Sequence, residues 1–288
     1  MMKSPNWRSF LFVPADNDRL FASALGRPAD VVILDLEDGV HPEHKADARS
    51  QLASRIPDLK KVSKGAAVRI NPDLNTAVTD LRTAVQPGLD LVLLPKVEHP
   101  RDVQLLSALV GDLEDAAGMA RGTVRFLLQV ESCAALPRLY EIAAADPRTM
   151  GMMLGSEDFS LDCGARPTPE LLFGPSMMLL HAARAARIQP IGFIAPIAEL
   201  GSIEQFAKTL EQARSLGFRG AVVVHPKFLD AVNACYRPAE AQLEEARRIV
   251  AGFEAAFAAG AGAVKVGDQM VDKPIYRRAL DLLQDAAA

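Results

Sequence analysis

The sequence predicts an α/β protein built on a parallel sheet: a TIM (β/α)8 barrel first, with an open doubly wound sheet as the alternative. Three observations support this prediction. Eight apolar runs of four to seven residues recur along the chain, helix-favouring segments lie between most of them, and ionisable residues follow the runs. Several runs are apolar at consecutive positions, which is typical of strands buried on both faces.

The apolar runs are the expected strands. They are Ser9–Val13, Val31–Leu36, Ala67–Ile70, Leu91–Leu94, Val124–Val130, Met150–Leu154, Pro190–Ile194 and Ala221–Val224. The expected helices carry apolar residues at three- and four-residue spacing. They are Asp18–Leu25, Asp73–Val85, Asp102–Leu113, Leu136–Ala144, Leu171–Ala186 and Ser202–Leu216. Gly26, Gly88 and Gly217 lie just beyond such segments, where glycine commonly ends a helix.

The last fifty or so residues break this alternation and predict a C-terminal helical extension. Residues Ala239–Ala258 have a strongly amphipathic pattern, and a glycine-rich link, Gly260–Gly262, follows them. Pro274 is placed to open a last helix that runs to Leu283. We therefore expect a barrel domain over residues 1–236 and an extension over residues 237–288.

The composition is that of a soluble globular protein with a full core. The chain of 288 residues is 49% hydrophobic and 24% charged, which excludes a disordered chain, a collagen-like chain and a membrane bundle. The net charge is −4, so nothing attracts the whole surface to nucleic acid or to an anionic membrane. Neither is expected as a partner, and an anionic ligand would need a local basic pocket.

The cysteines and the N-terminus bear on the compartment. Cys133, Cys163 and Cys235 are odd in number and far apart, and they predict neither a disulfide framework nor a metal site. The opening segment, Met1–Phe12, is too polar for the core of a signal peptide, and no apolar run is long enough to span a bilayer. A reducing, cytoplasmic location is therefore expected.

Ionisable residues follow six of the eight runs. They are Asp35, Glu37 and Asp38 after the second run, Arg69 at the third, Lys96 at the fourth, Glu131 at the fifth, Glu157 and Asp158 at the sixth, and His225 at the eighth. In a parallel barrel the carboxyl ends of the strands meet on one face, which is where active sites of this fold lie. The pattern predicts an active site at that face.

The carboxylates in this set indicate a divalent cation. Several acids in one mouth are unfavourable unless cations neutralise them, because like charges raise one another's pKa. Two carboxylates with waters and a substrate oxygen are the usual arrangement for Mg²⁺. No histidine or cysteine pair has zinc-ligand spacing. Mg²⁺ is therefore the preferred metal, with Mn²⁺ as the alternative.

Arg69 and Lys96 supply positive charge to the same face, and each has two interpretations. Arg69 can hold a substrate carboxylate or a developing enolate oxygen, or it can form a structural ion pair with Asp35 or Glu37. Lys96 can contribute to the chemistry, or it can only neutralise the acidic rim. The residues alone leave both alternatives open.

Nine motifs, in order along the chain, resemble those of the citrate lyase β-subunit-like enzymes, which include malyl-CoA and citramalyl-CoA lyases within the HpcH/HpaI aldolase group. The motifs are Arg8–Pro14, Val32–Val40, Lys45 with Arg49, Val68–Asn71, Leu93–Glu98, Gln129–Ser132, Gly155–Phe159, Val224–Pro226 and Met270–Pro274. Each motif is weak alone, but the ordered set covers nearly the whole chain. It also departs from the family pattern, because many relatives have arginine where this chain has Asn17.

The resemblance implies a TIM barrel with a Mg²⁺ site and a substrate pocket at the predicted face. Glu131 and Asp158 would hold the metal, and Arg69 would contact the substrate carbonyl. The resemblance further implies a substrate-binding set and a set along the CoA arm. The first is Asp35, Glu37, Arg69, Glu131, Glu157 and Asp158, and the second is Phe12, Val13, Asn17 and His225.

The resemblance also gives the tail a role. In this family the tail often lies over the active site of a neighbouring subunit and delivers an acidic residue, and Asp272 is the matching position. From the residues alone, an acid at a helix N-terminus before Pro274 is the favoured interpretation of Asp272, and only the motif match favours the catalytic one. A homo-oligomer, a trimer or a hexamer, is therefore expected.

The implied reaction is Mg²⁺-dependent cleavage of a 3-hydroxyacyl-CoA ester, of the citramalyl-CoA or malyl-CoA type, to acetyl-CoA and a 2-keto acid, or the reverse condensation. Arg69, Glu131 and Asp272 would be catalytic. Four alternatives remain: a citrate lyase β subunit acting on an acyl-carrier thioester, a CoA thioesterase on the same site, a CoA-free class II aldolase, and a non-catalytic barrel that binds CoA or keto acid. The expected partners are thus a small CoA thioester and a 2-keto acid.

Overall fold

The computed structural model describes residues 6–198 and 200–286. Its centre is an eight-stranded parallel sheet in the order β7-β6-β5-β4-β3-β2-β1-β8. The strands are β1 (Ser9–Pro14), β2 (Val31–Asp35), β3 (Gly65–Arg69), β4 (Leu91–Leu94), β5 (Arg125–Val130), β6 (Thr149–Leu154), β7 (Gln189–Pro190) and β8 (Ala221–Val223). Each of the eight predicted runs contributes to one of them, which confirms the parallel α/β class.

The sheet is curled so that its two edge strands come together. An isolated parallel bridge joins Ile191, just after β7, to Gly220, just before β8. The backbone N–H of Gly192 donates to the carbonyl of Gly220 at 2.9 Å, and that of Arg219 donates to Pro190 at 2.9 Å. β7 is only two residues long, so the predicted strand over 190–194 is mostly irregular chain.

The interior of the curled sheet is packed with side chains from most of its strands. The cluster contains Phe10, Val31, Ile33, Ala67, Leu91, Leu93, Leu127, Met150, Met153, Ile191 and Val222, all nearly inaccessible to solvent. In β2 the inward residues alternate, as the two-residue period of a strand requires. Because this interior is filled, the open space of the site lies above it, at the carboxyl ends of the strands.

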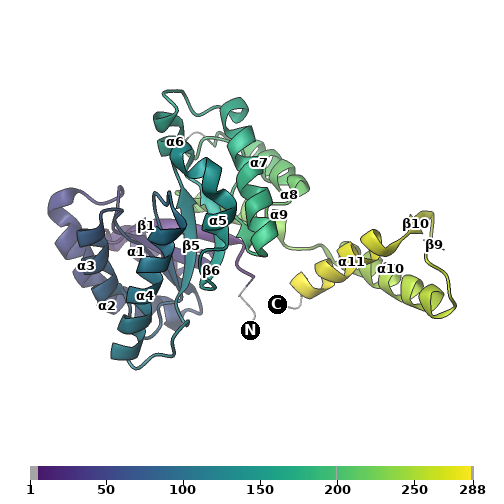
Figure 1. Cartoon of the computed structure of the whole chain (residues 1–288), viewed down its shortest axis with the longest axis horizontal. Helices are drawn as coiled ribbons and strands as arrows, with labels where there is room; N and C mark the ends of the chain where they lie inside the picture. The colour runs from purple at the N-terminus through teal and green to yellow at the C-terminus, as the bar shows by residue number, and fades with distance from the viewer. Residues whose placement is uncertain (1–5, 199, 287–288) are drawn as a thin grey trace. The chain divides into compact units, whose positions relative to one another are not determined.

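Helices cover the outside of the sheet (Figure 1). They are α1 (Asp18–Leu25), α2 (Lys45–Lys61), α3 (Leu74–Ala84), α4 (Pro100–Ala116), α5 (Leu139–Ala143), α6 (Ser156–Asp162), α7 (Pro169–Ala186), α8 (Ile203–Leu216) and α9 (Leu229–Tyr236), with short 3₁₀ segments η1 (Pro42–His44), η2 (Cys133–Arg138) and η3 (Pro226–Phe228). The sequence pattern does not predict α2, because that segment is highly polar and contains Pro57. The predicted helix over 136–144 begins as η2, which contains Pro137.

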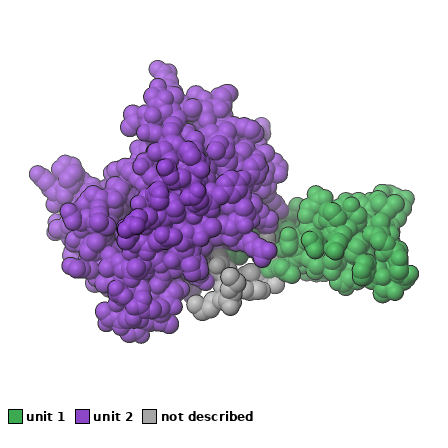
Figure 2. Space-filling view, viewed as in Figure 1, with its two compact units in different colours: residues 1–6, 235–288 green, residues 7–234 purple. Residues whose placement is uncertain are grey.

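Residues 235–286 belong to one of two compact units, unit 1 in Figure 2. It contains α10 (Glu240–Ala258), an antiparallel hairpin of β9 (Val264–Val266) and β10 (Gln269–Val271), and α11 (Lys273–Ala286). The two helices pack through their own cluster, in which Ile249, Phe253 and Val271 are buried. Unit 2 spans residues 7–234, while the division expected at 236/237 stays a prediction.

Within the described residues, no helix combines the length and the apolar character that crossing a membrane requires.

Candidate active site

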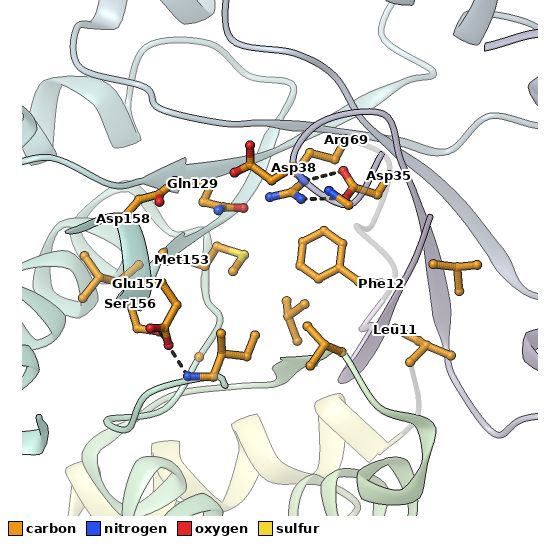
Figure 3. A pocket seen from close by; sticks show the side chains of 18 of the residues that line it. Leu11, Phe12, Asp35, Asp38, Arg69, Gln129, Met153, Ser156, Glu157 and Asp158 are labelled. Carbon is orange, nitrogen blue, oxygen red and sulfur yellow. Dashed lines mark hydrogen bonds and ion pairs between the residues drawn. The ribbon is translucent and has the colours of Figure 1, made fainter. Parts of the chain in front are cut away.

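A cavity of about 550 Å³ opens at the carboxyl ends of the strands in the unit of residues 7–234. The predicted site residues that line it are Phe12, Val13, Asp35, Arg69, Glu131, Glu157 and Asp158. Figure 3 shows Asp35, Arg69, Gln129 and Asp158 along one side of this space, with Phe12 and Met153 beside it. The cavity therefore has a polar side and an apolar side, as a site for a ligand with a charged end and an uncharged arm would.

Arg69 ends β3 and is held rigidly on the polar side. Its Nε and Nη2 donate to the two oxygens of Asp35, at 2.6 Å each, and its Nη1 lies 2.8 Å from a carboxylate oxygen of Glu37. Its guanidinium carbon lies 4.7 Å from the centre of the Phe12 ring. Burial lowers the pKa of Arg69, but Asp35 and Glu37 raise it by more, so Arg69 is a permanent cation.

Asp35, at the end of β2, is positioned by the turn that follows it. Its two oxygens also accept hydrogen bonds from the backbone N–H groups of Glu37 and Gly39, at 3.0 and 2.9 Å. Asp35 therefore orients Arg69 and is itself oriented by the backbone. Glu37 is 2% exposed and does not line the cavity, so it contacts Arg69 from behind.

Glu131 follows β5 and presents a buried carboxylate to the cavity. Its Oε1 accepts from the side-chain amide of Gln129 at 2.7 Å, and its Oε2 accepts from the backbone N–H of Lys96 at 2.9 Å. Burial first, and then the charge of Glu37, raise the pKa of Glu131 to about 7. A carboxylate with this pKa is only partly ionised at neutral pH, so a nearby cation would favour its charged form.

Gly155 allows Glu131 to occupy this place. A Cβ atom on Gly155 would lie 2.5 Å from Oε1 of Glu131 and 2.7 Å from its Cγ. Any side chain at this position would therefore displace the carboxylate. Gly155 also precedes α6, whose first turn carries Glu157 and Asp158. The close approach of Gly155 to Glu131 therefore brings the segment of Glu131 next to the segment of Glu157 and Asp158.

Lys96 follows β4 and connects the acids. Its backbone has a φ of 50°, in the left-handed region that is uncommon for residues other than glycine. Its ammonium lies 3.2 Å from Glu37, 3.3 Å from Asp158 and 3.8 Å from Asp38. Burial lowers the pKa of Lys96, but these acids, led by Glu37, raise it by more.

We call this group the acidic cluster: Asp35, Glu37, Asp38, Glu131 and Asp158, with Arg69 and Lys96. Among the described residues, two cations thus face five carboxylates. Glu37 contacts both cations, with one carboxylate oxygen 2.8 Å from Nη1 of Arg69 and the other 3.2 Å from the ammonium of Lys96. Burial raises the pKa of Glu37 as well. The cluster is therefore short of positive charge.

The donor set suits a hard divalent cation. Glu131 and Asp158 offer carboxylate oxygens at the cavity, and the pKa of Glu131 includes a contribution from Asp158. In the part of the chain that the structure describes, no three histidine, cysteine or acidic side chains converge as metal ligands. Two protein carboxylates, with waters completing the shell, are what Mg²⁺ commonly accepts, whereas a structural zinc site needs four ligands.

Glu157 lies at another part of the cavity wall. Its Oε1 accepts from the backbone N–H of Ala198 at 3.4 Å and lies 3.4 Å from the hydroxyl oxygen of Ser156. The hydroxyl of Ser156 in turn accepts from the backbone N–H of Ile197 at 3.2 Å. Glu157 and Ser156 thus hold the chain after β7 against α6, and this contact shapes the cavity.

Two other predicted residues of the same unit do not line the cavity. The side chain of Asn17 caps α1 by accepting from the backbone N–H of Leu20 at 2.9 Å. His225 caps η3 through Lys227, although its neighbours Val224 and Pro226 line the cavity. Asp272 belongs to unit 1, where it accepts from the backbone N–H of Ile275 at 3.2 Å.

Sequence reasoning missed several lining residues. Gln129 lies two residues before Glu131, on the same face of β5, and the two-residue period could have identified it. The apolar lining includes Leu11, Leu20, Ala24, Met153, Leu172, Phe193 and Val222. Such side chains resemble core residues in a sequence, so only the three-dimensional arrangement identifies them.

The parallel α/β fold with charged residues at the strand ends defines an enzyme of the barrel-like α/β class. A family model described as HpcH/HpaI aldolase/citrate lyase matches residues 8–226, and the chain belongs to this family. Citrate lyase subunit beta from Leuconostoc mesenteroides subsp. cremoris is 32% identical over 285 residues, covering 98% of this chain and 93% of that protein. The L-malyl-CoA/beta-methylmalyl-CoA lyase of Cereibacter sphaeroides is 32% identical over 305 residues, covering 98% and 95%.

Solved structures agree. CitE from Mycobacterium tuberculosis, in complex with magnesium, acetoacetate and coenzyme A, superposes with a TM-score of 0.71 at 29% identity, covering 98% of each chain. A citrate lyase from Burkholderia xenovorans LB400 has a TM-score of 0.83 and covers 100% of this chain and 93% of that one. At 21% identity it supports the fold alone. The chain is an enzyme of the lyase class, and the predicted resemblance to citrate lyase β subunits is confirmed.

Proposed function

We propose that the protein is a Mg²⁺-dependent carbon–carbon lyase acting on a 3-hydroxyacyl-CoA ester of the citramalyl-CoA or malyl-CoA type. Loss of the hydroxyl proton breaks the adjacent carbon–carbon bond and gives a 2-keto acid and a thioester enolate. Protonation of the enolate carbon then gives acetyl-CoA, and the reverse reaction is a condensation. We further propose that the curled sheet is a complete (β/α)8 barrel with residues 237–288 as its extension.

One observation carries the proposal: a fixed arginine lines the same cavity as two carboxylates, Glu131 and Asp158, of a cluster that has fewer cations than acids. Arg69 supplies positive charge at one point, and Glu131 and Asp158 supply negative charge at another. A substrate with a carbonyl oxygen to be stabilised and a hydroxy acid to be chelated matches both. The names of the relatives, citrate lyase subunit beta and malyl-CoA lyase, support the same class of substrate.

Glu131 and Asp158 are the residues that would hold Mg²⁺, because they line the cavity and belong to a cluster that lacks positive charge. When bound, Mg²⁺ would supply Lewis acidity that lowers the pKa of the substrate hydroxyl. Gln129 and the backbone N–H of Lys96 keep the Glu131 carboxylate in place for this role. The M. tuberculosis CitE complex, which contains magnesium, supports the choice of metal.

Arg69 is the group that would stabilise the enolate oxygen. Three of its N–H groups face Asp35 and Glu37, which leaves two of the five that a guanidinium carries. Because Asp35, Glu37 and Phe12 fix the guanidinium beforehand, it need not reorganise as charge develops. The role proposed for Asp35 and Glu37 in substrate binding is thus indirect, through Arg69.

The apolar side of the cavity would accept the uncharged arm of the thioester. Phe12 and Val13 line the cavity, and their contact with the CoA arm, which the family resemblance implies, is part of the proposal. Glu157 and Asp158 lie in the first turn of α6, whose N-cap, Gly155, has no side chain to cap it, and the backbone there would help to bind the carboxylate of the keto acid. Contacts of Asn17 and His225 with CoA stay predictions.

Asp272 is proposed to exchange the proton at the enolate carbon, delivered from a neighbouring copy in a trimer or hexamer. Asp272→Asn tests this cleanly, because Asn caps a helix as well as Asp does and should keep α11 intact. We expect turnover to fall by about 10²–10⁴-fold, the usual contribution of a general acid or base, while Mg²⁺ affinity is unchanged. Loss of Mg²⁺ affinity would contradict the role.

The deciding experiment incubates the purified protein with Mg²⁺ and either citramalyl-CoA or malyl-CoA, and measures keto acid and free CoA thiol separately. Keto acid without thiol supports the lyase. Thiol without keto acid indicates a thioesterase on the same site, and tight binding without either product indicates a non-catalytic barrel. Keto acid released from citramalate or malate without CoA indicates a class II aldolase.

Two matched variants test the site. Glu131→Gln removes a carboxylate at the cavity and is expected to abolish Mg²⁺-dependent turnover. Glu114→Gln removes a carboxylate that is equally buried but lies at the amino ends of the strands, and turnover per folded molecule should be unchanged. Retained activity in Glu131→Gln would overturn the ligand assignment.

A citrate lyase β subunit is the second candidate, because relatives with that name match at the same 32% identity as the malyl-CoA lyase. It would act on a thioester of an acyl-carrier protein. Comparing cleavage of a citryl-carrier thioester with cleavage of the CoA esters distinguishes the two candidates. A cytoplasmic location is a further prediction.

A further inference from the structure

Two cysteines that are thirty positions apart in the sequence meet beside the site. The sulfur atoms of Cys133 and Cys163 lie 3.2 Å apart. Cys133 begins η2, just after β5, and Cys163 directly follows α6. The backbone N–H of Cys133 donates to the carboxylate of Asp162 at 2.7 Å, which holds the two segments together independently of the thiols.

The geometry needs only a small movement to become a covalent bond. Both residues are free thiols, Cys133 is exposed, and Cys163 is partly exposed, so a small oxidant can reach the pair. The sulfur atoms of a disulfide lie about 2.05 Å apart, so bond formation shortens the present 3.2 Å contact by about 1.2 Å. We propose that Cys133 and Cys163 are a redox-modification site that closes reversibly to an intramolecular disulfide under a peroxide.

The chemistry balances with hydrogen peroxide as the oxidant. One thiolate attacks a peroxide oxygen, the O–O bond breaks, and a sulfenic acid and hydroxide form. The second thiol attacks the sulfenic sulfur, the S–O bond breaks, and water leaves with the disulfide formed. In total, two thiols and one peroxide give one disulfide and two waters, and a dithiol reductant reverses the change.

The resting form of the pair depends on the compartment. In a reducing compartment thiols are kept reduced, so the pair rests as the dithiol and the disulfide forms under sustained oxidation.

The two cysteines lie on the same segments as the two carboxylates proposed to hold Mg²⁺. Cys133 lies two residues after Glu131, and Cys163 follows the helix that carries Asp158. A disulfide would tie the two segments that carry these carboxylates. The inference goes beyond the proposed lyase function and does not depend on it, because its test reads thiols and mass rather than turnover.

The test treats the reduced, full-length protein with a stoichiometric amount of hydrogen peroxide at pH 8 until the thiol count is constant, then counts thiols after denaturation. We expect the three thiols to fall to one, with a mass loss of two hydrogen atoms. Peptide mapping should join the peptides of Cys133 and Cys163, and dithiothreitol should restore all three thiols. Three thiols remaining, only intermolecular disulfides, or only irreversible acids would overturn the proposal.

Variants distinguish disulfide formation between Cys133 and Cys163 from general thiol oxidation. Cys133→Ser and Cys163→Ser should each abolish the intramolecular disulfide. Cys235→Ser is the matched control, because Cys235 is buried in the other unit. Its loss should leave the rate of disulfide formation between Cys133 and Cys163 unchanged. The mapping of the wild-type protein decides the question even if a variant folds poorly.

Discussion

Two buried charged networks lie at opposite ends of the same sheet and differ in one respect. At the amino ends of β5 and β6, Arg148 donates to both oxygens of Glu114, at 2.9 and 2.7 Å, and to the hydroxyl of Ser107 at 3.1 Å. Glu114 also accepts the backbone N–H groups of Gly122 and Val124. We call this group the paired network, in which one cation matches one carboxylate.

The pKa values of the buried carboxylates shift in opposite directions in the paired network and in the acidic cluster. Burial alone would raise the pKa of Glu114, but Arg148 and the two backbone donors lower it overall. In the acidic cluster, burial and neighbouring acids raise the pKa of Glu37 and of Glu131. A buried carboxylate whose pKa is lowered is already stabilised by the fold, whereas one whose pKa is raised indicates a cation that the fold does not supply.

The largest effect on the free energy of unfolding is expected from a substitution that breaks the paired network. Arg148→Met leaves the carboxylate of Glu114, which is 0% exposed, without its charged partner. We expect a loss of about 3–5 kcal/mol in the free energy of unfolding, measured by urea denaturation. Turnover per folded molecule should be unchanged, because Arg148 lies at the end of the sheet away from the cavity.

Arg121→Met is the control for that variant. Arg121 pairs with Asp112 and Asp115 on the exposed surface near the same end of the sheet, so its loss should cost far less stability. Equal destabilisation by the two variants would contradict the distinction between a buried and an exposed pair.

The next effect is the pH dependence of stability. The pKa of Glu131 is about 7 in the folded state, against an ordinary value of 4.5, so the folded state keeps a proton that the unfolded chain gives up. Stability without metal should therefore fall as the pH rises from about 4.5 to 7, by about 3 kcal/mol from this group. Mg²⁺ should oppose the fall, because it favours the ionised carboxylate.

Thermal or urea unfolding at pH 5, 6, 7 and 8, with and without Mg²⁺, measures this effect. The informative quantity is the difference between wild type and Glu131→Gln, which removes the titrating group and keeps most of its shape. An identical pH slope in both proteins would show that Glu131 titrates normally.

Much of the fold could be predicted from the sequence, because burial on both faces leaves a direct record in residue type. The run Val31–Leu36 predicts β2 to within one residue, and Gly217 marks the end of α8. The pattern fails where tertiary contacts override it. α2 has a narrow buried face and an internal proline. β7 ends after two residues, and the chain that follows it, with Gly192 at a φ of 140°, leaves the strand and lines the cavity.

The site was predictable as a set of residues and not as a set of roles. Placing Asp35, Arg69 and Glu131 at one face needed only the rule that the ends of parallel strands meet. The distances between their atoms were needed to show that both carboxylate oxygens of Asp35 bind the guanidinium of Arg69. The contact of Cys133 with Cys163 left no sequence signal, since their spacing of thirty residues has no local meaning.

The smallest effects come from a matched pair of variants that remove one negative charge at each end of the sheet. Glu114→Gln loses charge-assisted hydrogen bonds with Arg148 and should lower the free energy of unfolding by about 2–3 kcal/mol. Glu37→Gln removes an acid from a cluster that has more acids than cations, and this relief offsets the weaker contacts with Arg69 at 2.8 Å and with Lys96 at 3.2 Å. Its effect without Mg²⁺ should be below about 1 kcal/mol, or stabilising.

Urea denaturation of both variants, without Mg²⁺ at pH 7.5, gives the comparison directly. The charge of Glu37 raises the pKa of Glu131. In Glu37→Gln, the loss of stability with rising pH should therefore be smaller than in the wild type, and it should end at a lower pH. This direction follows because Glu131 would then ionise more readily in the folded state, with a smaller difference from the unfolded chain. If Glu37→Gln were as destabilising as Glu114→Gln, the contacts of Glu37 with Arg69 and Lys96 would outweigh the relief of negative charge, and the excess of negative charge at the cavity would have to be assigned to Glu131 and Asp158 alone.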